Sequence, residues 1–123
     1  MEQIVIRLNP IEHLELSVNE NRWTQVCLIG KGQKLALGAE DCSIILSRLA
    51  KLIGAFSTSE ANDKIEGIPV IWVLSLSELH SSLFWGKTSI GETVLFVQNG
   101  DGTIIGHLQI DTSGLKQELE RIK

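Results

Sequence analysis

Apolar and polar residues alternate one by one over several short segments of this chain, and this two-residue period constrains the fold more than any other feature. It is clearest over residues 13–18, where Leu14, Leu16 and Val18 alternate with polar neighbours. Successive side chains of a strand point to opposite faces, so this segment predicts a strand with one face in water. Similar patterns predict further strands over residues 3–8, 22–29, 35–37, 68–76, 92–98 and 103–110.

The period changes to about 3.6 residues in two segments, which predicts two helices. The first covers residues 40–56 and begins at Glu40 and Asp41, whose carboxylates complement the unpaired N–H groups of a helix N-terminus. The second follows Asp111, and residues 79–85 fit either a helix or a strand. The apolar stripes of the two helices are formed by Ile45, Leu49, Leu52 and Phe56, and by Leu115, Leu119 and Ile122.

These elements predict an α+β fold, with a mostly antiparallel sheet of about six to seven strands and two helices packed on one face. Glycine-containing turns at residues 30–33 and 99–102 are typical of hairpins. Each of these hairpins precedes one of the predicted helices, so the chain carries a weak internal repeat of a hairpin followed by a helix. We expect a single domain over residues 1–123, with the polar segment 57–67 as a surface loop.

The net charge of −4 argues against nucleic acid and against an anionic membrane as partners, because both attract clusters of Lys and Arg. Charged residues interrupt the N-terminus at Glu2 and Arg7, unlike a signal peptide, and the longest apolar run, residues 68–74, is too short to span a bilayer as a helix. We therefore expect a cytoplasmic protein. Cys27 and Cys42 lack the spacing of a disulfide framework or a zinc site, so no metal or other cofactor is expected.

Two short motifs resemble parts of ligand-binding loops but lack the other residues that those loops need. The segment 86–88, Gly-Lys-Thr, ends as a phosphate-binding loop does, yet Ser81 occupies the position of its first glycine and no helix is predicted to follow. If Gly102 were the sixth residue of a calcium loop, Val97 and Leu108 would occupy two ligand positions. Neither motif therefore predicts a phosphate or calcium site.

The segment from Ser75 to Trp85 holds the densest set of polar side chains, at the end of the most apolar strand. His80 is an imidazole that can act as a general base toward a serine, and Glu78 can orient it. However, the serines lack the flanking glycines of a nucleophile elbow, and a histidine here can simply cap backbone groups. Glu78, His80 and Ser82 are therefore candidates for the wall of a pocket, and no catalytic residue is assigned.

Aromatic residues suggest an interaction surface, because the chain has three Trp and no Tyr and an exposed Trp would mark a binding surface. We expect Trp72 to lie in the core and Trp85, beside Phe84, to lie at an interface. The candidate interface residues are Ile71, Val73, Phe84 and Trp85.

The leading hypothesis is a non-catalytic protein-interaction or assembly module that forms a homodimer through this apolar strand surface. The acidic net charge would favour a basic or neutral protein as any further partner. The alternative is a small-molecule-binding domain or a minor enzyme with a pocket near His80. A third hypothesis, a regulatory subunit that acts through the loop 57–67, depends on that loop alone.

Overall fold

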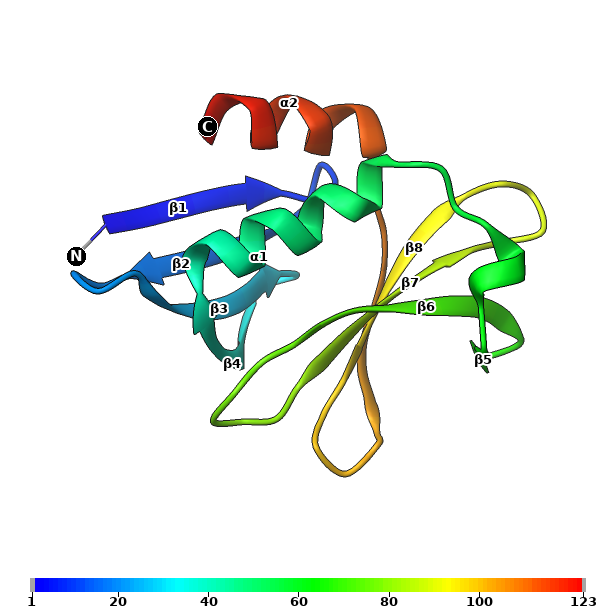
Figure 1. The fold of residues 1–123 in the computed structure, drawn as a ribbon, viewed down its shortest axis with the longest axis horizontal. Helices are drawn as coiled ribbons and strands as arrows, with labels where there is room; N and C mark the ends of the chain where they lie inside the picture. Colours follow the sequence, from blue (N-terminus) through cyan, green and yellow to red (C-terminus); the bar gives the residue numbers. More distant parts are fainter. Residues whose placement is uncertain (1, 123) are drawn as a thin grey trace.

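The computed structural model describes residues 2–122 and contains two antiparallel sheets with two α-helices packed against them (Figure 1). In the first sheet the four strands follow one another in space as they do in the chain. They are β1 (Glu2–Arg7), β2 (Glu12–Val18), β3 (Trp23–Gly30) and β4 (Gln33–Asp41).

The second sheet is also an antiparallel meander, with five strands in chain order. They are β5 (Asp63–Ile65), β6 (Ile68–Ser75), β7 (Ser82–Lys87), β8 (Thr93–Gln98) and β9 (Ile104–Gln109). The short β5 lies inside the segment expected to be a loop, and β7 covers most of the segment whose period was undecided.

Both predicted helices are confirmed, and each begins at an aspartate. Asp41 caps α1 (Cys42–Leu49), because its Oδ1 accepts hydrogen bonds from the Ser43 backbone N–H, at 2.9 Å, and from the Ser43 hydroxyl. The 3₁₀ turn η1 (Ala50–Ile53) extends α1 and ends at Gly54, and a second 3₁₀ turn, η2 (Thr58–Glu60), precedes β5. At α2 (Thr112–Ile122), the carboxylate and carbonyl of Asp111 accept hydrogen bonds from the backbone N–H groups of Gly114 and Leu115.

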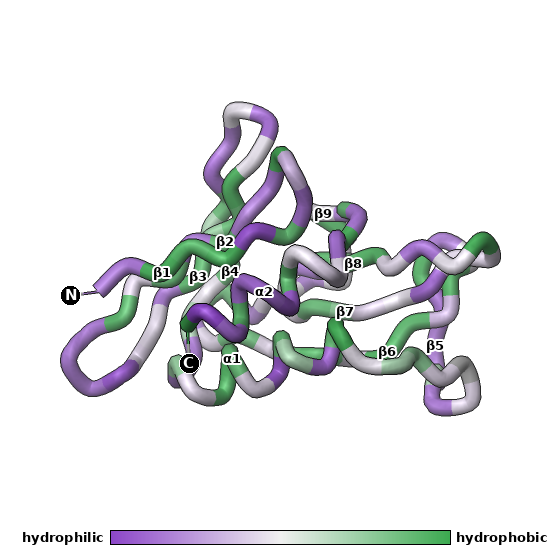
Figure 2. Tube along the Cα trace, turned by 90° about the horizontal axis from the view of Figure 1, so that it is seen from above, coloured by the Kyte–Doolittle hydropathy of each residue, from purple (hydrophilic) through white to green (hydrophobic). Residues whose placement is uncertain are grey.

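The main hydrophobic core is shared by the two sheets and the helices. Residues of the first sheet, such as Leu14 and Leu16, belong to the same buried cluster as Leu83 and Leu95 of the second. The helix α1 packs against β4 and β6, while α2 packs against β1 and η1. Figure 2 shows hydrophobic residues along the strands and mainly hydrophilic residues in α2 and at the turns. A smaller cluster of Val70, Val94 and Phe96 fills the other face of the second sheet.

The expectation of one sheet with six or seven strands is wrong, because residues 2–122 form nine strands in two sheets. The two sheets meet at an isolated antiparallel bridge, in which the Ala39 N–H donates to the Ser77 carbonyl at 3.1 Å and the Ser77 N–H donates to the Ala39 carbonyl at 2.8 Å. Gly38 permits this approach, since it has a φ of +131° and a Cβ there would overlap the Ser77 carbonyl oxygen. Because it is a single residue pair, this bridge joins β4 to the end of β6 without merging the two sheets into one.

Candidate functional site

The three predicted pocket residues lie in or beside the β6–β7 loop and do not converge. Glu78 and His80 are exposed, with φ values of +72° and +57°, and Ser82 is half-buried at the start of β7. Ser82 Oγ lies 3.0 Å from Ser75 Oγ, and within residues 2–122 no hydrogen bond joins Ser82 to Glu78 or His80. The structure therefore shows no hydrogen bond between Ser82 and His80, the imidazole that the sequence offered as a general base without assigning it a catalytic role.

The β6–β7 loop has a structural role that accounts for its polar composition. Ser77 makes the bridge to Ala39, and the Leu76 N–H donates to the Ser81 carbonyl at 2.8 Å. Ser81 is buried, while Leu79 is about half exposed. The loop joins the two sheets through the Ser77–Ala39 bridge. Polar residues, two of them with a positive φ, are typical of such a turn.

The structure reverses the expected positions of two tryptophans. Trp85 is only 5% exposed and packs edge-on against Phe56, with ring centroids 5.2 Å apart, whereas Trp72 is 44% exposed. Of the other candidate interface residues, Val73 is buried, and Ile71 and Phe84 are half-buried. Trp85 and Val73 therefore belong to the core and cannot form a surface in this conformation.

A β-bulge explains this reversal. Trp72 pairs with Phe84 and Leu74 pairs with Leu83, so Val73 is an extra residue on β6. Trp72 thus shares its face with Val70, away from the main core, while Leu74 turns into that core. Residues 68–74 are all apolar, so no polar residue around Val73 reveals where the alternation changes.

Trp72 is held in a fixed position by polar neighbours. Its indole N–H donates to Ser75 Oγ at 2.8 Å, and the Arg48 guanidinium carbon lies 5.0 Å from the ring centroid, within the range of a cation–π contact. Ile44, one helical turn before Arg48, is 43% exposed. We call Ile44, Arg48, Trp72 and Ser75 the Trp72 face.

Charge is distributed unevenly along the Trp72 face. The acidic end holds Asp41, at the start of α1, and the exposed Glu78, which follows the residue bonded to Ala39. The basic end holds Arg48 and the exposed Lys51, and the salt bridges found within residues 2–122 involve neither of them. The Ser43 side-chain hydrogen bond lowers the pKa of Asp41 below its ordinary value, and the nearby charge of Arg22 acts in the same direction.

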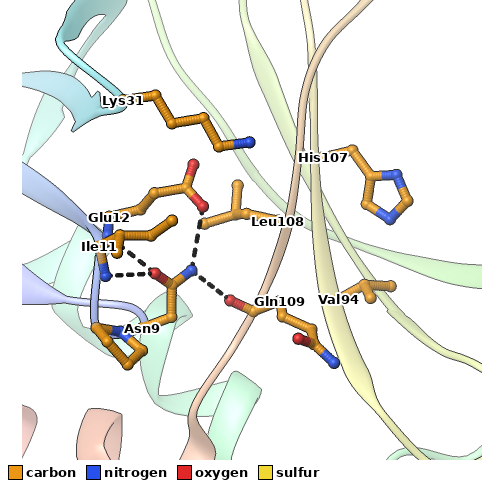
Figure 3. Close-up of a pocket in the computed structure, with 9 residues that line it drawn as sticks. Asn9, Ile11, Glu12, Lys31, Val94, His107, Leu108 and Gln109 are labelled. Atoms are coloured by element: carbon orange, nitrogen blue, oxygen red, sulfur yellow. Dashed lines mark hydrogen bonds between the residues drawn. The ribbon is translucent and has the colours of Figure 1, made fainter.

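A second candidate site is a cleft of about 430 Å³ between the two sheets (Figure 3). It is lined by the β1–β2 and β3–β4 turns of the first sheet and by β8 and β9 of the second. Asn9 closes its floor, because its amide oxygen accepts from the N–H groups of Ile11 and Glu12 and its amide nitrogen donates to the Gln109 carbonyl at 2.8 Å. The Lys31 side chain extends over Leu108 from the β3–β4 turn. We call this cavity the Asn9 cleft; its lining residues are Asn9, Pro10, Ile11, Glu12, Lys31, Val94, His107, Leu108 and Gln109.

Other cavities of about 320 to 590 Å³ lie elsewhere on the surface. One, of about 590 Å³, lies between β1 and the C-terminal end of α2, where Arg121 donates to the Val5 carbonyl at 3.3 Å. None of the cavities described here has Glu78, His80 or Ser82 among its lining residues.

The turn 99–102 joins β8 to β9, as expected for a hairpin. Asn99 Oδ1 accepts from the backbone N–H groups of Asp101 and Thr103, and Asp101 Oδ1 accepts from Thr103 at 2.9 Å. The hydrogen bonds from Thr103, that of its side chain first, lower the pKa of Asp101. The carboxylate of Asp101 is thus used within the turn.

Residues 2–122 contain no group of three or more His, Cys, Asp or Glu side chains placed to hold a metal ion. His107 Nδ1 lies 3.3 Å from a Glu66 carboxylate oxygen, and the His107 ring lies over Phe96 with centroids 4.4 Å apart. Neither α-helix in the described part of the chain has the length and apolar character needed to cross a bilayer.

The residues of the Trp72 face and the Asn9 cleft come from separate segments of the sequence, which no local motif connects. The one local signal was Lys31 between two glycines, which was interpreted only as a hairpin turn. Comparison with known proteins adds no assignment: no family model, curated protein or solved structure matches the chain.

Proposed function

We propose that the chain is a non-catalytic assembly module that forms a homodimer through the Trp72 face. The observation that carries this proposal is Trp72 itself, a large aromatic side chain that is 44% exposed yet oriented by Ser75 and Arg48. Trp and Arg are enriched among the residues that dominate binding energy, and an ordered side chain loses less entropy on binding.

A second copy of the chain is the partner that suits this face, because the face is complementary to itself. A two-fold axis near Ile44 would place α1 antiparallel to its copy, so that Arg48 and Lys51 of each chain approach Asp41 and Glu78 of the other. Asp41 and Arg48 are separated by about 10 Å along the helix at 1.5 Å per residue, so both ion pairs fit within one small interface. Ile44 and Trp72 would supply its apolar centre.

The required area is modest. A stable interface buries about 600 Å² or more on each copy, which is less than a tenth of the 6876 Å² of accessible surface. The exposed side of α1 together with the adjacent part of β6 offers a continuous surface for this purpose, since α1 packs directly against β6.

Sedimentation velocity over a wide concentration range tests the proposal. The wild-type chain of 13.6 kDa should sediment as a dimer at high concentration, and Trp72→Ala should raise the dimer Kd about 30-fold, the equivalent of about 2 kcal/mol for a hot-spot residue. Ile44→Glu should have a similar effect. Ile90→Glu is the matched control, because Ile90 is 78% exposed but lies in the β7–β8 turn, away from this face.

A charge test separates this arrangement from general hydrophobic association. Arg48→Glu should weaken the dimer, and added salt should weaken the wild-type dimer more than that of Arg48→Glu. A wild-type chain that stays monomeric at several hundred micromolar would overturn the proposal, as would equal effects of Ile90→Glu and Ile44→Glu.

A further inference from the structure

The Asn9 cleft contains opposite charges that are not paired with each other. Glu12 and the exposed Lys31 both line it, yet the salt bridges within residues 2–122 include none between them. Glu12 Oε1 accepts from the Asn9 amide at 3.2 Å, which holds the carboxylate at the wall of the cleft. A ligand with one positive and one negative group could therefore bind Glu12 through the first group and Lys31 through the second.

Lys31 has a left-handed backbone conformation, which glycine or asparagine adopts at a lower free energy than lysine. Its φ is +54°, in a two-residue turn with Gly32 at +73°, where glycine or asparagine is the usual choice. Backbone strain of this kind costs on the order of 1 kcal/mol and is common at binding sites. In Figure 3 the strained position directs the Lys31 ammonium group across the cleft.

Within residues 2–122, the outer edge of β9 directs backbone groups toward the same cleft. Ile110 donates its N–H to the Thr93 carbonyl, so by alternation the N–H and C=O groups of His107 and Gln109 point away from β8. Asn9 already uses the Gln109 carbonyl. The His107 N–H and C=O groups thus face the side of β9 on which the cleft lies.

The remaining wall is apolar and partly exposed. Ile11 is 64% exposed and Pro10 lies beside it, while Leu108 and Val94, each only 4% exposed, reach the lining from opposite faces of the second sheet. The volume of about 430 Å³ lies in the lower part of the range for small-molecule sites, which combine an apolar wall with a few placed polar groups.

We propose that the Asn9 cleft binds a free α-amino acid with an apolar side chain. Lys31 and the His107 N–H bind the carboxylate, Glu12 binds the ammonium group, and Ile11, Pro10 and the edge of Leu108 contact the side chain. A simple anion would be repelled by Glu12 and a simple cation by Lys31, so the zwitterion is the ligand class that suits both charges.

Titration of the full chain with L-leucine, followed by ¹H–¹⁵N correlation spectra, tests this site. We expect saturable shifts at residues 9–12, 31 and 107–109. Leucine amide lacks the carboxylate and 4-methylpentanoate lacks the ammonium group, so each should bind at least tenfold more weakly than leucine. Alanine, with a smaller apolar side chain, should also bind more weakly.

Matched variants locate the binding. Lys31→Gln and Glu12→Gln should each weaken leucine binding at least tenfold, whereas Lys34→Gln and Glu15→Gln should leave it unchanged. The last two residues form a salt bridge of 3.3 Å in the same sheet and do not line the cleft. Lys31→Gln removes no hydrogen bond found within residues 2–122, so it reports on binding even if Glu12→Gln disturbs the Asn9 turn.

Three results would overturn the proposal: no saturable shift at these residues with tens of millimolar leucine, binding of leucine amide or 4-methylpentanoate as tight as that of leucine, or equal binding by the Lys31→Gln and Lys34→Gln variants. The site is independent of the homodimer, because none of its lining residues belongs to the Trp72 face.

Discussion

Replacement of Gly38 by alanine should destabilise the fold more than any other glycine-to-alanine change compared below. Gly38 has a φ of +131°, and a Cβ there would overlap the Ser77 carbonyl oxygen and lie 2.9 Å from the Leu76 Cβ. The overlap is with backbone atoms, so no side-chain rotation relieves it. Either β4 stays strained or it moves away from the β6–β7 loop.

The loss of unfolding free energy can be worked out for two cases, one in which β4 stays in place and one in which it moves. A positive φ for a non-glycine residue costs about 1–2 kcal/mol, and overpacking costs about 1–3 kcal/mol. If β4 moves instead, the two hydrogen bonds between Ala39 and Ser77 are lost at about 1 kcal/mol each. Gly38→Ala should therefore lower the free energy of unfolding by about 2–5 kcal/mol, a large part of the 5–15 kcal/mol typical of a small domain.

Urea denaturation, monitored by tryptophan fluorescence and circular dichroism, measures this loss against two controls. Gly32→Ala introduces a positive φ of +73° with no atom within 4 Å of the new Cβ, so it should cost only about 1–2 kcal/mol. Gly54 has a negative φ, and Gly54→Ala should be neutral or slightly stabilising. If Gly38→Ala costs no more than Gly32→Ala, the overlap with Ser77 is not what shapes the join between the sheets.

Three further predictions concern the two tryptophans, the start of α1 and the His107 contact. Trp85→Ala should cost about 3–5 kcal/mol of unfolding free energy, whereas Trp72→Ala in the monomer should cost about 1 kcal/mol and should lower the iodide-quenchable fluorescence more than Trp85→Ala does, with the half-buried Trp23 contributing in both; equal costs would contradict the assigned burial. The pKa of Asp41 is lowered from 3.8 in the folded chain, so the stabilising contribution of its carboxylate is present above about pH 4 and is lost as the pH falls through the folded value. The difference in unfolding free energy between wild type and Asp41→Asn should therefore shrink on acidification. A difference that stays constant would argue against the cap. Glu66→Gln should change the free energy of unfolding by less than about 0.5 kcal/mol in chemical denaturation, because both groups of the Glu66–His107 pair are about half exposed. A loss above about 1 kcal/mol would show that this ion pair stabilises the second sheet.

Local patterns predicted those elements whose burial is one-sided. The first helix is an example, since Ile45, Leu49 and Leu52 are all fully buried as their spacing indicates, and Asp41 caps the helix as its position suggests. The strand β2 likewise buries Leu14 and leaves its polar neighbours half-exposed. In each case a clear difference between polar and apolar faces determined the orientation.

Segments that are apolar on both faces could not be oriented in this way. In β7, Leu83 and Trp85 face the main core while Phe84 packs on the smaller cluster, so both faces are apolar and the two-residue period is hidden. The strand β5 has only three residues and pairs with β6 through a two-residue turn at Glu66 and Gly67, and its polar composition hides this short hairpin. The Asn9 cleft was not predicted because its residues come from four separate segments of the sequence, which only the tertiary fold brings together.

The bulge at Val73 determines which tryptophan can meet a partner. In an unbulged strand, Trp72 and Leu74 would point to the same face, as the alternation predicts. Because Val73 is an extra residue, Leu74 can enter the main core opposite Leu83 while Trp72 stays on the outer face opposite Phe84. The polar residues Ser75 and Ser82 follow on that outer face, and their hydroxyls, 3.0 Å apart, end its apolar surface beside the indole N–H. One strand thus supplies the core on one side and an oriented aromatic anchor on the other, which is why the proposed interface lies on the outer face of β6, at its border with α1.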